Sequence, residues 1–209
     1  MIQVFDCEQN TDEWRAARLG LPTASEFATV MAEGRKKGEP SKTRHTYMLK
    51  LAGEILTGEP AETYTNAHME RGKAMEYEAR QAYCFLTDAD PQRVGFIRNG
   101  DKGCSPDSLI GDGGGLEIKT ALPHIQIDRL LRGDLPAEHR HQVQGCLWVT
   151  EREWWDFVSY WPALPLLKVR VYRDNGFIAQ MAGEVARFND ELAEMVEKIR
   201  RYGEMEKAA

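Results

Sequence analysis

The sequence predicts an α/β protein in which helices cover the faces of a mixed central β-sheet. Three observations support this class. Short apolar segments separated by glycine-rich turns lie within residues 93–120, segments with the apolar spacing of helices precede and follow them, and two further apolar segments come before a final amphipathic stretch. Elements in this order pack as a sheet with helices on its faces. No linker-like segment divides the chain, so we expect a single domain over residues 1–209.

The first predicted elements are two short helices. Residues 12–19 have the pattern of a helix that ends at Gly20. Thr23 and Glu26 then form the T-x-x-E pattern of a capping box, in which each side chain accepts a hydrogen bond from the main-chain N–H of the other residue. A second helix should therefore begin near Ala24.

Longer helices are predicted between a basic loop and the sheet. Residues 33–44 form a polar loop that contains five Lys and Arg residues. Apolar residues then recur at helical spacing over residues 47–56, in a helix that ends at Gly58. They do so again over residues 66–86.

Strands are predicted from residue 93 onward. They cover residues 93–98, 108–110 and 116–120, and strong turn signals lie between them at 99–103 and 111–115. We expect these three strands to form a meander within the sheet.

The C-terminal part of the chain is predicted to add both helices and strands. The elements in chain order are helices over residues 125–131 and 136–150, strands over 154–161 and 166–172, and an amphipathic helix over 176–202.

The charge balance and the hydropathy pattern exclude several classes of protein. The chain has 27 Lys and Arg residues against 33 Asp and Glu residues, so its formal net charge is −6. This excludes a protein that coats nucleic acid by bulk positive charge, but it allows a local basic groove, since charges act over about 8–10 Å in physiological salt. No run of 18 or more apolar residues and no signal-peptide pattern occurs, so we expect no membrane segment and a cytoplasmic location.

The sequence lacks the ligand patterns of a zinc site. Cys7, Cys84, Cys104 and Cys146 are widely spaced and form no CxxC pair, and the five histidines show no H-x-x-x-H spacing. These patterns disfavour a zinc hydrolase, and we expect four reduced thiols.

One predicted hairpin brings acidic and basic side chains together. Asp107 lies ten residues before Glu117, and Lys119 is two residues further on. The last two side chains leave the same face of a strand, about 7 Å apart, and the glycine turn brings Asp107 alongside. Two adjacent carboxylates repel each other unless a cation lies between them, and their oxygen atoms suit Mg²⁺ or Mn²⁺.

Such a hairpin has the composition of a metal-dependent phosphodiesterase site. The main-chain carbonyl of Ile118 is a candidate for a further metal ligand, and the Lys119 ammonium is a candidate for holding and polarising the attacking water. A metal ion there would activate water and neutralise charge on the phosphoryl oxygens. A bare E-x-K pattern is also typical of an exposed ion pair, but the whole string, in which Asp lies ten positions before the Glu of E-x-K and a glycine turn separates them, is much rarer.

Five short motifs occur in order along the chain. They are Arg18-Leu19-Gly20 with Thr23-Ala24-Ser25, Gly72-Lys73 with Glu76, Ser105-Pro106-Asp107-Ser108-Leu109, Gly115-Leu116-Glu117-Ile118-Lys119, and His141-Gln142-Val143-Gln144 with Trp148-Val149. Together they resemble the phage lambda exonuclease family, the YqaJ-type viral recombinases of the PD-(D/E)xK nuclease superfamily. Ser108 departs from the family, which usually has glycine there, but this change leaves the neighbouring acid intact.

The resemblance implies a fold, an activity and partners. The implied fold has a restriction-endonuclease-like core. The implied activity is a Mg²⁺-dependent, processive 5′-to-3′ exonuclease that acts on double-stranded DNA ends bearing a 5′-phosphate and leaves 3′ single-stranded overhangs for recombination by strand annealing. Mn²⁺ is expected to substitute for Mg²⁺. The resemblance also implies a homotrimeric ring, a single-strand annealing protein as partner, and a phage or prophage gene product in the cytoplasm of a bacterial host cell.

The resemblance also implies roles for residues outside the hairpin. Glu76 would complete the acidic site, although its spacing from Arg80 also suits an ordinary helix ion pair. Gln142 would orient water or DNA, and the alternative is a polar helix face. Arg18 and Ser25 would bind the 5′-terminal phosphate, because a helix start and a guanidinium both favour anions; the alternative is a capped helix beside a surface arginine.

Four residues are candidates for further DNA contacts. Arg35, Lys36 and Lys37 lie in the basic loop and are candidates for contacts with DNA phosphates. The alternative is that these charged residues only face solvent. Met69 lies one heptad before Glu76, and we hypothesise that it wedges into the terminal base pair. The alternative for Met69 is a core methionine.

Two other functions fit the same residues. A restriction- or repair-type endonuclease on the same core would cut circular DNA, whereas an end-dependent enzyme would leave it intact. A catalytically silent subunit would bind DNA ends and cut nothing. The presence of Asp107, Glu117 and Lys119 argues against the silent subunit.

Overall fold

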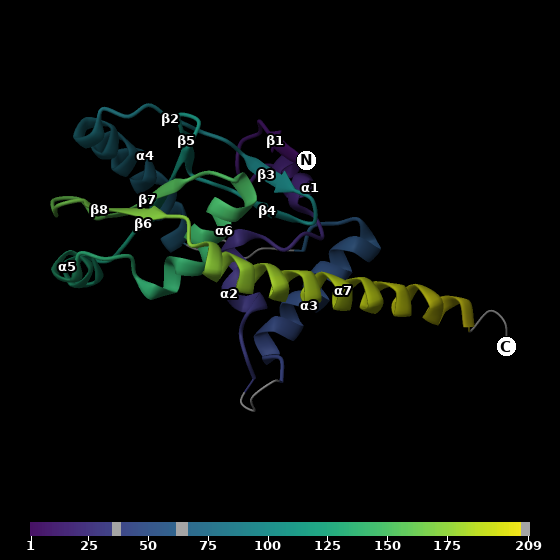
Figure 1. Cartoon of the computed structure of the whole chain (residues 1–209). Helices are drawn as coiled ribbons and strands as arrows, with labels where there is room; N and C mark the ends of the chain where they lie inside the picture. The colour runs from purple at the N-terminus through teal and green to yellow at the C-terminus, as the bar shows by residue number, and fades with distance from the viewer. Residues whose placement is uncertain (35–38, 62–66, 206–209) are drawn as a thin grey trace.

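The computed structural model places a mixed β-sheet between helices (Figure 1). It describes residues 1–34, 39–61 and 67–205. The helices and 3₁₀ turns (η) are α1 (Asp12–Arg18), η1 (Ala24–Glu26), α2 (Phe27–Val30), α3 (Lys42–Thr57), α4 (Ala67–Thr87), α5 (Pro123–Arg132), η2 (Ala137–His139), α6 (Arg140–Thr150) and α7 (Asn175–Met205). The strands are β1 (Ile2–Phe5), β2 (Pro91–Gln92), β3 (Phe96–Asn99), β4 (Lys102–Cys104), β5 (Ser108–Ile110), β6 (Gly114–Thr120), β7 (Trp154–Tyr160) and β8 (Leu167–Tyr172).

The main sheet has five strands in the order β2, β5, β6, β7 and β8. The central strands β6 and β7 run parallel, and the other neighbouring pairs run antiparallel. A parallel pair needs a crossover connection, which α5, η2 and α6 supply between β6 and β7. The α/β class and the mixed sheet predicted from the sequence are confirmed.

A second sheet of three strands corrects the predicted meander. The strand expected at residues 93–98 does not join β5 and β6; as β3 it pairs with β1 and β4 in a separate antiparallel sheet. The chain passes from this sheet to the main one at Ser105-Pro106-Asp107, where the proline has no N–H to extend a strand ladder. The strands β1, β2 and β4 were not predicted; each is a short edge strand of two to four residues, and residues 102 and 103 of β4 were expected to belong to a turn.

The predicted capping box does not form at the start of η1. The Thr23 side chain accepts no main-chain hydrogen bond from this turn and instead contacts Arg18 and Ser25. The Glu26 carboxylate accepts a hydrogen bond from Thr29. The result is a single 3₁₀ turn followed by the four-residue α2, rather than a continuous helix from Ala24.

The helix α3 begins earlier than predicted. Ser41 Oγ accepts a hydrogen bond from the Arg44 N–H at 3.1 Å, so the helix starts at Lys42, inside the segment expected to be a loop. It ends as predicted at Gly58, whose φ of 74° lies in the left-handed region. The predicted helices that correspond to α1, α4, α5 and α7 agree with the structure to within a few residues.

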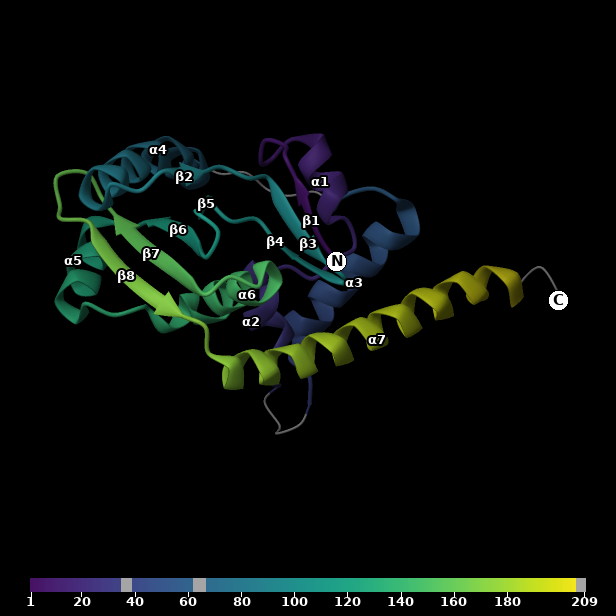
Figure 2. The same ribbon diagram turned by 45° about the horizontal axis from the view of Figure 1, so that its top comes forward.

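Helices cover both faces of the main sheet (Figure 2). On one face α4 packs against β6 and β7 through a small cluster: Ala79, Tyr83, Leu116, Ile118 and Val158. On the other face, residues of α6 pack against β7, and α2, α3 and α7 extend the same core, which includes Trp155, Phe157 and Phe188. The β6 side chains that face α6 therefore lie between the sheet and a helix.

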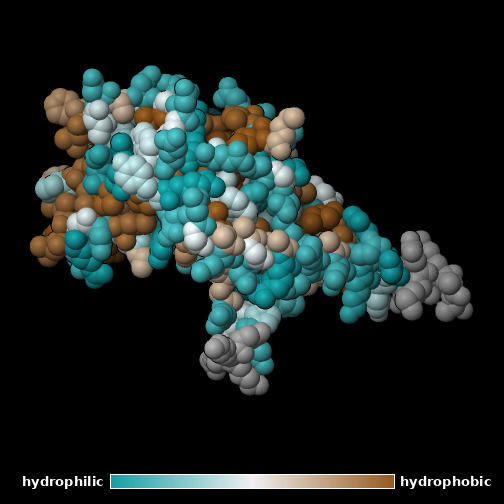
Figure 3. Space-filling view, in the orientation of Figure 1, coloured by the Kyte–Doolittle hydropathy of each residue, from teal (hydrophilic) through white to brown (hydrophobic). Residues whose placement is uncertain are grey.

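Apolar side chains stay exposed at the end of the molecule that carries α5. Ile127 and Leu131 on this helix are 48% and 83% exposed. In Figure 3, apolar surface gathers at the left end, where Figure 1 has α5. Among the described residues, no helix is both long enough and apolar enough to cross a lipid bilayer. The four cysteines form no disulfide, as predicted.

Candidate active site

The strand β6 directs Glu117 and Lys119 to the face that α6 covers. Leu116 and Ile118 alternate with them and point to the α4 side. Lys119 Nζ lies 2.6 Å from Glu117 Oε1, so the two side chains share a face as predicted. From α6, Gln142 Nε2 donates a hydrogen bond to the same oxygen at 2.6 Å.

Asp107 lies immediately before β5, next to the strand that carries Glu117. Its Oδ2 atom accepts a hydrogen bond from the Ile118 N–H at 2.5 Å, which fixes the carboxylate against β6. Burial, with the nearby charges of Glu117 and Glu76, raises the pKa of Asp107 well above its usual value. The predicted hairpin therefore places Asp107 against β6, the strand that carries Glu117.

Glu117 has one carboxylate oxygen without a partner. The side chain is only 2% exposed, and both of its donors, Lys119 and Gln142, bind Oε1. In the described part of the chain, the buried Oε2 atom has no hydrogen-bond partner. A buried carboxylate oxygen without a donor is costly, and a divalent cation would satisfy it.

The charges around this oxygen also fit a cation. The carboxylates of Glu117 and Asp107 raise the pKa of Lys119 to about 12, so its amine is charged at neutral pH. Within residues 1–34, 39–61 and 67–205, no group of three or more His, Cys, Asp or Glu side chains is placed to hold a metal ion by itself. Mg²⁺ commonly keeps main-chain or solvent oxygens among its ligands.

Glu76 faces the same region from α4. Its Oε1 atom accepts a hydrogen bond from Arg80 Nη2 at 2.6 Å, so the ordinary helix ion pair considered from the sequence does form. The same Arg80 nitrogen donates to the Asp107 carbonyl at 3.2 Å, so Glu76 lies near the acidic site as well. A cavity of about 650 Å³ opens onto both acids and is bounded on the other side by residues 6–10.

Arg18 lies beside the two hydroxyl groups of the predicted phosphate pocket. Its Nη2 atom donates to Thr23 Oγ1 at 3.4 Å, and that oxygen lies 3.3 Å from Ser25 Oγ. Burial lowers the pKa of Arg18, and no carboxylate in the described residues forms an ion pair with it. The expected helix N-terminus is replaced by the 3₁₀ turn, so any anion site here depends on the guanidinium and the hydroxyl groups.

Trp14 is a residue that the sequence analysis missed. The Arg18 guanidinium lies 4.2 Å from the centre of its ring. The indole Nε1 donates to Ser105 Oγ at 2.9 Å and to the Gly95 carbonyl at 3.1 Å. Trp14 therefore joins the Arg18 pocket to the segment that carries Asp107. Its position four residues before Arg18 on a predicted helix was the available signal.

Some predicted DNA contacts cannot be placed. Arg35, Lys36 and Lys37 lie outside the described residues, and so does the side chain of Met69. Ile118 is buried on β6, where its N–H binds Asp107; the proposed role of its carbonyl stays a prediction.

Comparisons with known proteins identify the family and the fold of the chain. A family model described as the YqaJ-like viral recombinase domain matches residues 13–153, more than half of the chain. The structure is similar to the crystal structure of an alkaline exonuclease, LHK-Exo, from Laribacter hongkongensis, with a TM-score of 0.84 and 36% sequence identity over 95% of this chain and 100% of that chain. The structure of LHK-Exo in complex with dAMP gives the same values.

A more distant match supports the fold alone. A phage related exonuclease from Haemophilus somnus 129PT has a TM-score of 0.64 and 14% identity, covering 86% of this chain and 96% of that chain. No curated protein matches the sequence. The restriction-endonuclease-like fold implied by the motifs is confirmed, and the chain belongs to the YqaJ-like viral recombinase domain family.

Proposed function

We propose that this protein is a divalent-metal-dependent exonuclease that degrades double-stranded DNA from its ends. The observation that carries the proposal is the buried Glu117 carboxylate, which has Lys119 and Gln142 on one oxygen and, among the described residues, no partner on the other. Membership of a viral recombinase family and the 36% identity to an alkaline exonuclease support the same chemistry. More specifically, we propose that a single nuclease domain over residues 1–209 digests DNA processively in the 5′-to-3′ direction and leaves 3′ overhangs for strand annealing.

The proposed cofactor is Mg²⁺, with Mn²⁺ as a substitute. Asp107, Glu117 and the Ile118 carbonyl would hold the ion, and Glu76 would complete the acidic site. The bound ion would supply activation of water and neutralisation of charge on the phosphoryl oxygens.

The other side chains of the site have separate proposed roles. The charged Lys119 amine holds Glu117 in place and provides positive charge where negative charge develops on the phosphate during cleavage. Gln142 fixes the same carboxylate from α6, and its amide orients water or DNA. Both side chains act at a partly closed site between the sheet and a helix, where fixed charges act more strongly than in water.

Arg18 and Ser25 are the proposed pocket for the 5′-terminal phosphate, with Thr23 between them. A guanidinium that forms no ion pair with a carboxylate in the described part of the chain, next to two hydroxyl groups, suits a phosphate group. Trp14 connects this pocket to the segment before Asp107. Binding of the terminal phosphate would therefore place the first phosphodiester of the strand at the acidic site.

Replacement of Arg18 by alanine is expected to remove the preference for 5′-phosphorylated ends. The loss of charge-assisted hydrogen bonds corresponds to a decrease in rate of about tenfold or more on such ends. Initial rates on duplexes with a 5′-phosphate or a 5′-hydroxyl measure the effect. Arg15→Ala is the matched control, since Arg15 lies on the same helix and pairs with the exposed Asp12. The pocket would be contradicted if both variants lost the preference for 5′-phosphorylated ends equally, or if Arg18→Ala kept that preference unchanged.

The proposed assembly is a homotrimeric ring that works with a single-strand annealing protein in the cytoplasm of a bacterial host. The exposed apolar side chains of α5 support a surface that contacts another protein chain. The basic residues Arg35, Lys36 and Lys37 and the Met69 wedge remain proposals for contacts with the duplex.

Digestion of matched DNA substrates tests the proposed function. We expect linear duplex with 5′-phosphates to be degraded in Mg²⁺, with loss of nucleotides from the 5′-terminated strand, and not in EDTA. Covalently closed circular DNA of the same sequence should stay intact. Cleavage of the circle would favour the endonuclease alternative, and binding of ends without any cleavage would favour the silent subunit.

A further inference from the structure

Arg80 connects two elements that carry acidic residues of the site. Its side chain is only 9% exposed. On α4, its Nη2 atom binds Glu76 Oε1 at 2.6 Å; on the strand side, the same nitrogen donates to the Asp107 carbonyl at 3.2 Å. One guanidinium therefore fixes the separation of a helix carboxylate and the main chain of Asp107.

Ser108 fixes the guanidinium itself. Its Oγ atom accepts a hydrogen bond from Arg80 Nε at 3.1 Å, and the serine is completely buried. In the β5–β6 register Ser108 lies opposite Leu116, the residue before Glu117. The Arg80 side chain is thus held in place by the same hairpin that positions Asp107 and Glu117.

Two possible roles of Arg80 predict opposite effects of its removal on cation affinity. If it only offsets negative charge, its removal should strengthen cation binding, because Glu76, Asp107 and Glu117 would then face fewer positive charges. If it orients Glu76, its removal should weaken cation binding, because the 30% exposed Glu76 side chain would gain rotamer freedom that must be lost again on binding.

We propose that Arg80, held by Ser108, is a positioning residue that keeps Glu76 beside Asp107 for binding of a divalent cation. The contacts favour orientation over simple charge compensation, because Arg80 makes hydrogen bonds to three groups in defined directions from a buried position. The inference rests on the proposed function only in taking a divalent cation as the cofactor.

Calorimetric titration of Mn²⁺ into DNA-free protein tests the inference. Arg80→Gln is expected to weaken Mn²⁺ binding by about 10- to 100-fold, the usual effect of removing a group that orients a metal ligand. Arg80→Lys should restore part of the affinity, since an ammonium keeps the charge but not the planar set of donors. Ser108→Ala, which removes one hydroxyl group, should give a smaller loss.

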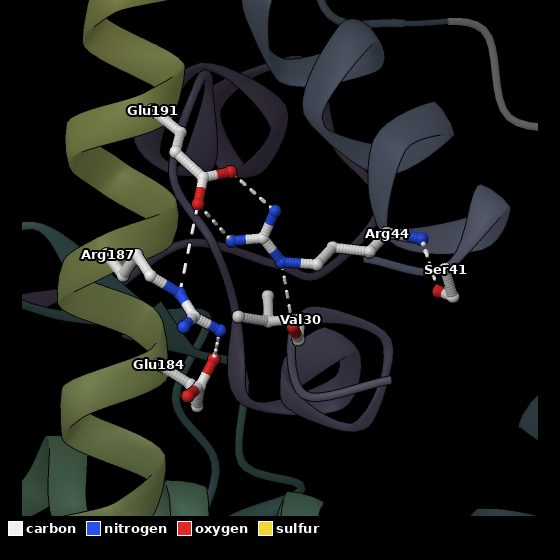
Figure 4. Close-up of polar contacts among 6 residues, drawn as sticks. All are labelled: Val30, Ser41, Arg44, Glu184, Arg187 and Glu191. Atoms are coloured by element: carbon white, nitrogen blue, oxygen red, sulfur yellow. Dashed lines mark hydrogen bonds and ion pairs between the residues drawn. The ribbon is translucent and has the colours of Figure 1, made fainter. Parts of the chain in front are cut away.

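Arg44 offers a matched control. It is also a buried arginine that binds one carboxylate and one main-chain carbonyl: its Nη atoms lie 2.6 and 3.1 Å from Glu191, and its Nε donates to the Val30 carbonyl at 3.1 Å (Figure 4). None of these partners belongs to the acidic site. Arg44→Gln should lower the melting temperature and leave the Mn²⁺ affinity unchanged.

Unchanged or tighter Mn²⁺ binding by folded Arg80→Gln would overturn the inference. If that variant does not fold, wild-type affinity in Ser108→Ala, or absence of Mn²⁺ binding by the wild type, would overturn it. Cleavage is not the readout, so the two proposals can fail separately. A protein that binds Mn²⁺ with the expected dependence on Arg80 but degrades no DNA would contradict the exonuclease and leave this inference standing.

Discussion

Replacement of Lys119 by alanine is expected to lower the rate of DNA-end digestion by about 10²- to 10³-fold, the usual effect of removing one fixed electrostatic group from an active site. The amine lies 2.6 Å from Glu117 Oε1 and is charged at neutral pH, because the neighbouring carboxylates raise its pKa to about 12. Its loss leaves Gln142 as the one remaining donor to that oxygen in the described site and removes positive charge from the place proposed for the scissile phosphate.

The release of nucleotides from linear 5′-phosphorylated duplex in Mg²⁺ measures this effect. Lys102→Ala is the control, because Lys102 binds the Asn99 carbonyl and lies over the Trp148 ring, with no contact to the acidic residues. The control should retain wild-type activity. Undiminished cleavage by Lys119→Ala would show that the amine takes no part in the reaction.

Replacement of Asp156 by alanine is expected to lower the free energy of unfolding by about 3 kcal/mol, at the low end of the range for breaking a buried ion pair. Asp156 is fully buried on β7 and accepts hydrogen bonds from Tyr83 at 2.7 Å and from two Arg170 nitrogens at 2.8 Å. Burial and the adjacent carboxylate raise the pKa of Tyr83, so its hydroxyl stays a donor. We expect a stability loss at the low end of that range because Arg170 is 38% exposed, so water can solvate its guanidinium in Asp156→Ala.

Denaturant unfolding of the variant measures this loss of stability. Asp128→Asn is the control, since Asp128 forms a surface pair with Arg132 at 3.0 Å and such pairs contribute little. Its midpoint should stay close to that of the wild type. Equal midpoints for all three proteins would contradict a stabilising role for the buried pair.

The hairpin could be predicted because it depends on local rules. The two-residue period of a strand puts Glu117 and Lys119 on one face, and the glycine turn returns the chain beside Asp107. The amphipathic spacing of the long helices was equally informative, because burial of one helix face repeats every three to four residues.

Other features depend on contacts between distant segments and left no local signal. The pairing of β3 with β1 joins segments more than 90 residues apart, so the spacing of apolar residues could not distinguish it from a meander. The Thr23 hydroxyl was expected to cap a helix, but Arg18 and Ser25 compete for it. Arg80 was recognised only as a helix partner of Glu76, since its bonds to Asp107 and Ser108 depend on how α4 packs.

Anomalous diffraction from a crystal soaked in Mn²⁺ shows whether Asp107 and Glu117, with Lys119 beside them, form the site of a divalent cation. We expect an anomalous peak between the two carboxylates, with Glu117 Oε2 as a ligand. A well-ordered site with no peak at that oxygen, or Mn²⁺ bound only elsewhere on the protein, would contradict it.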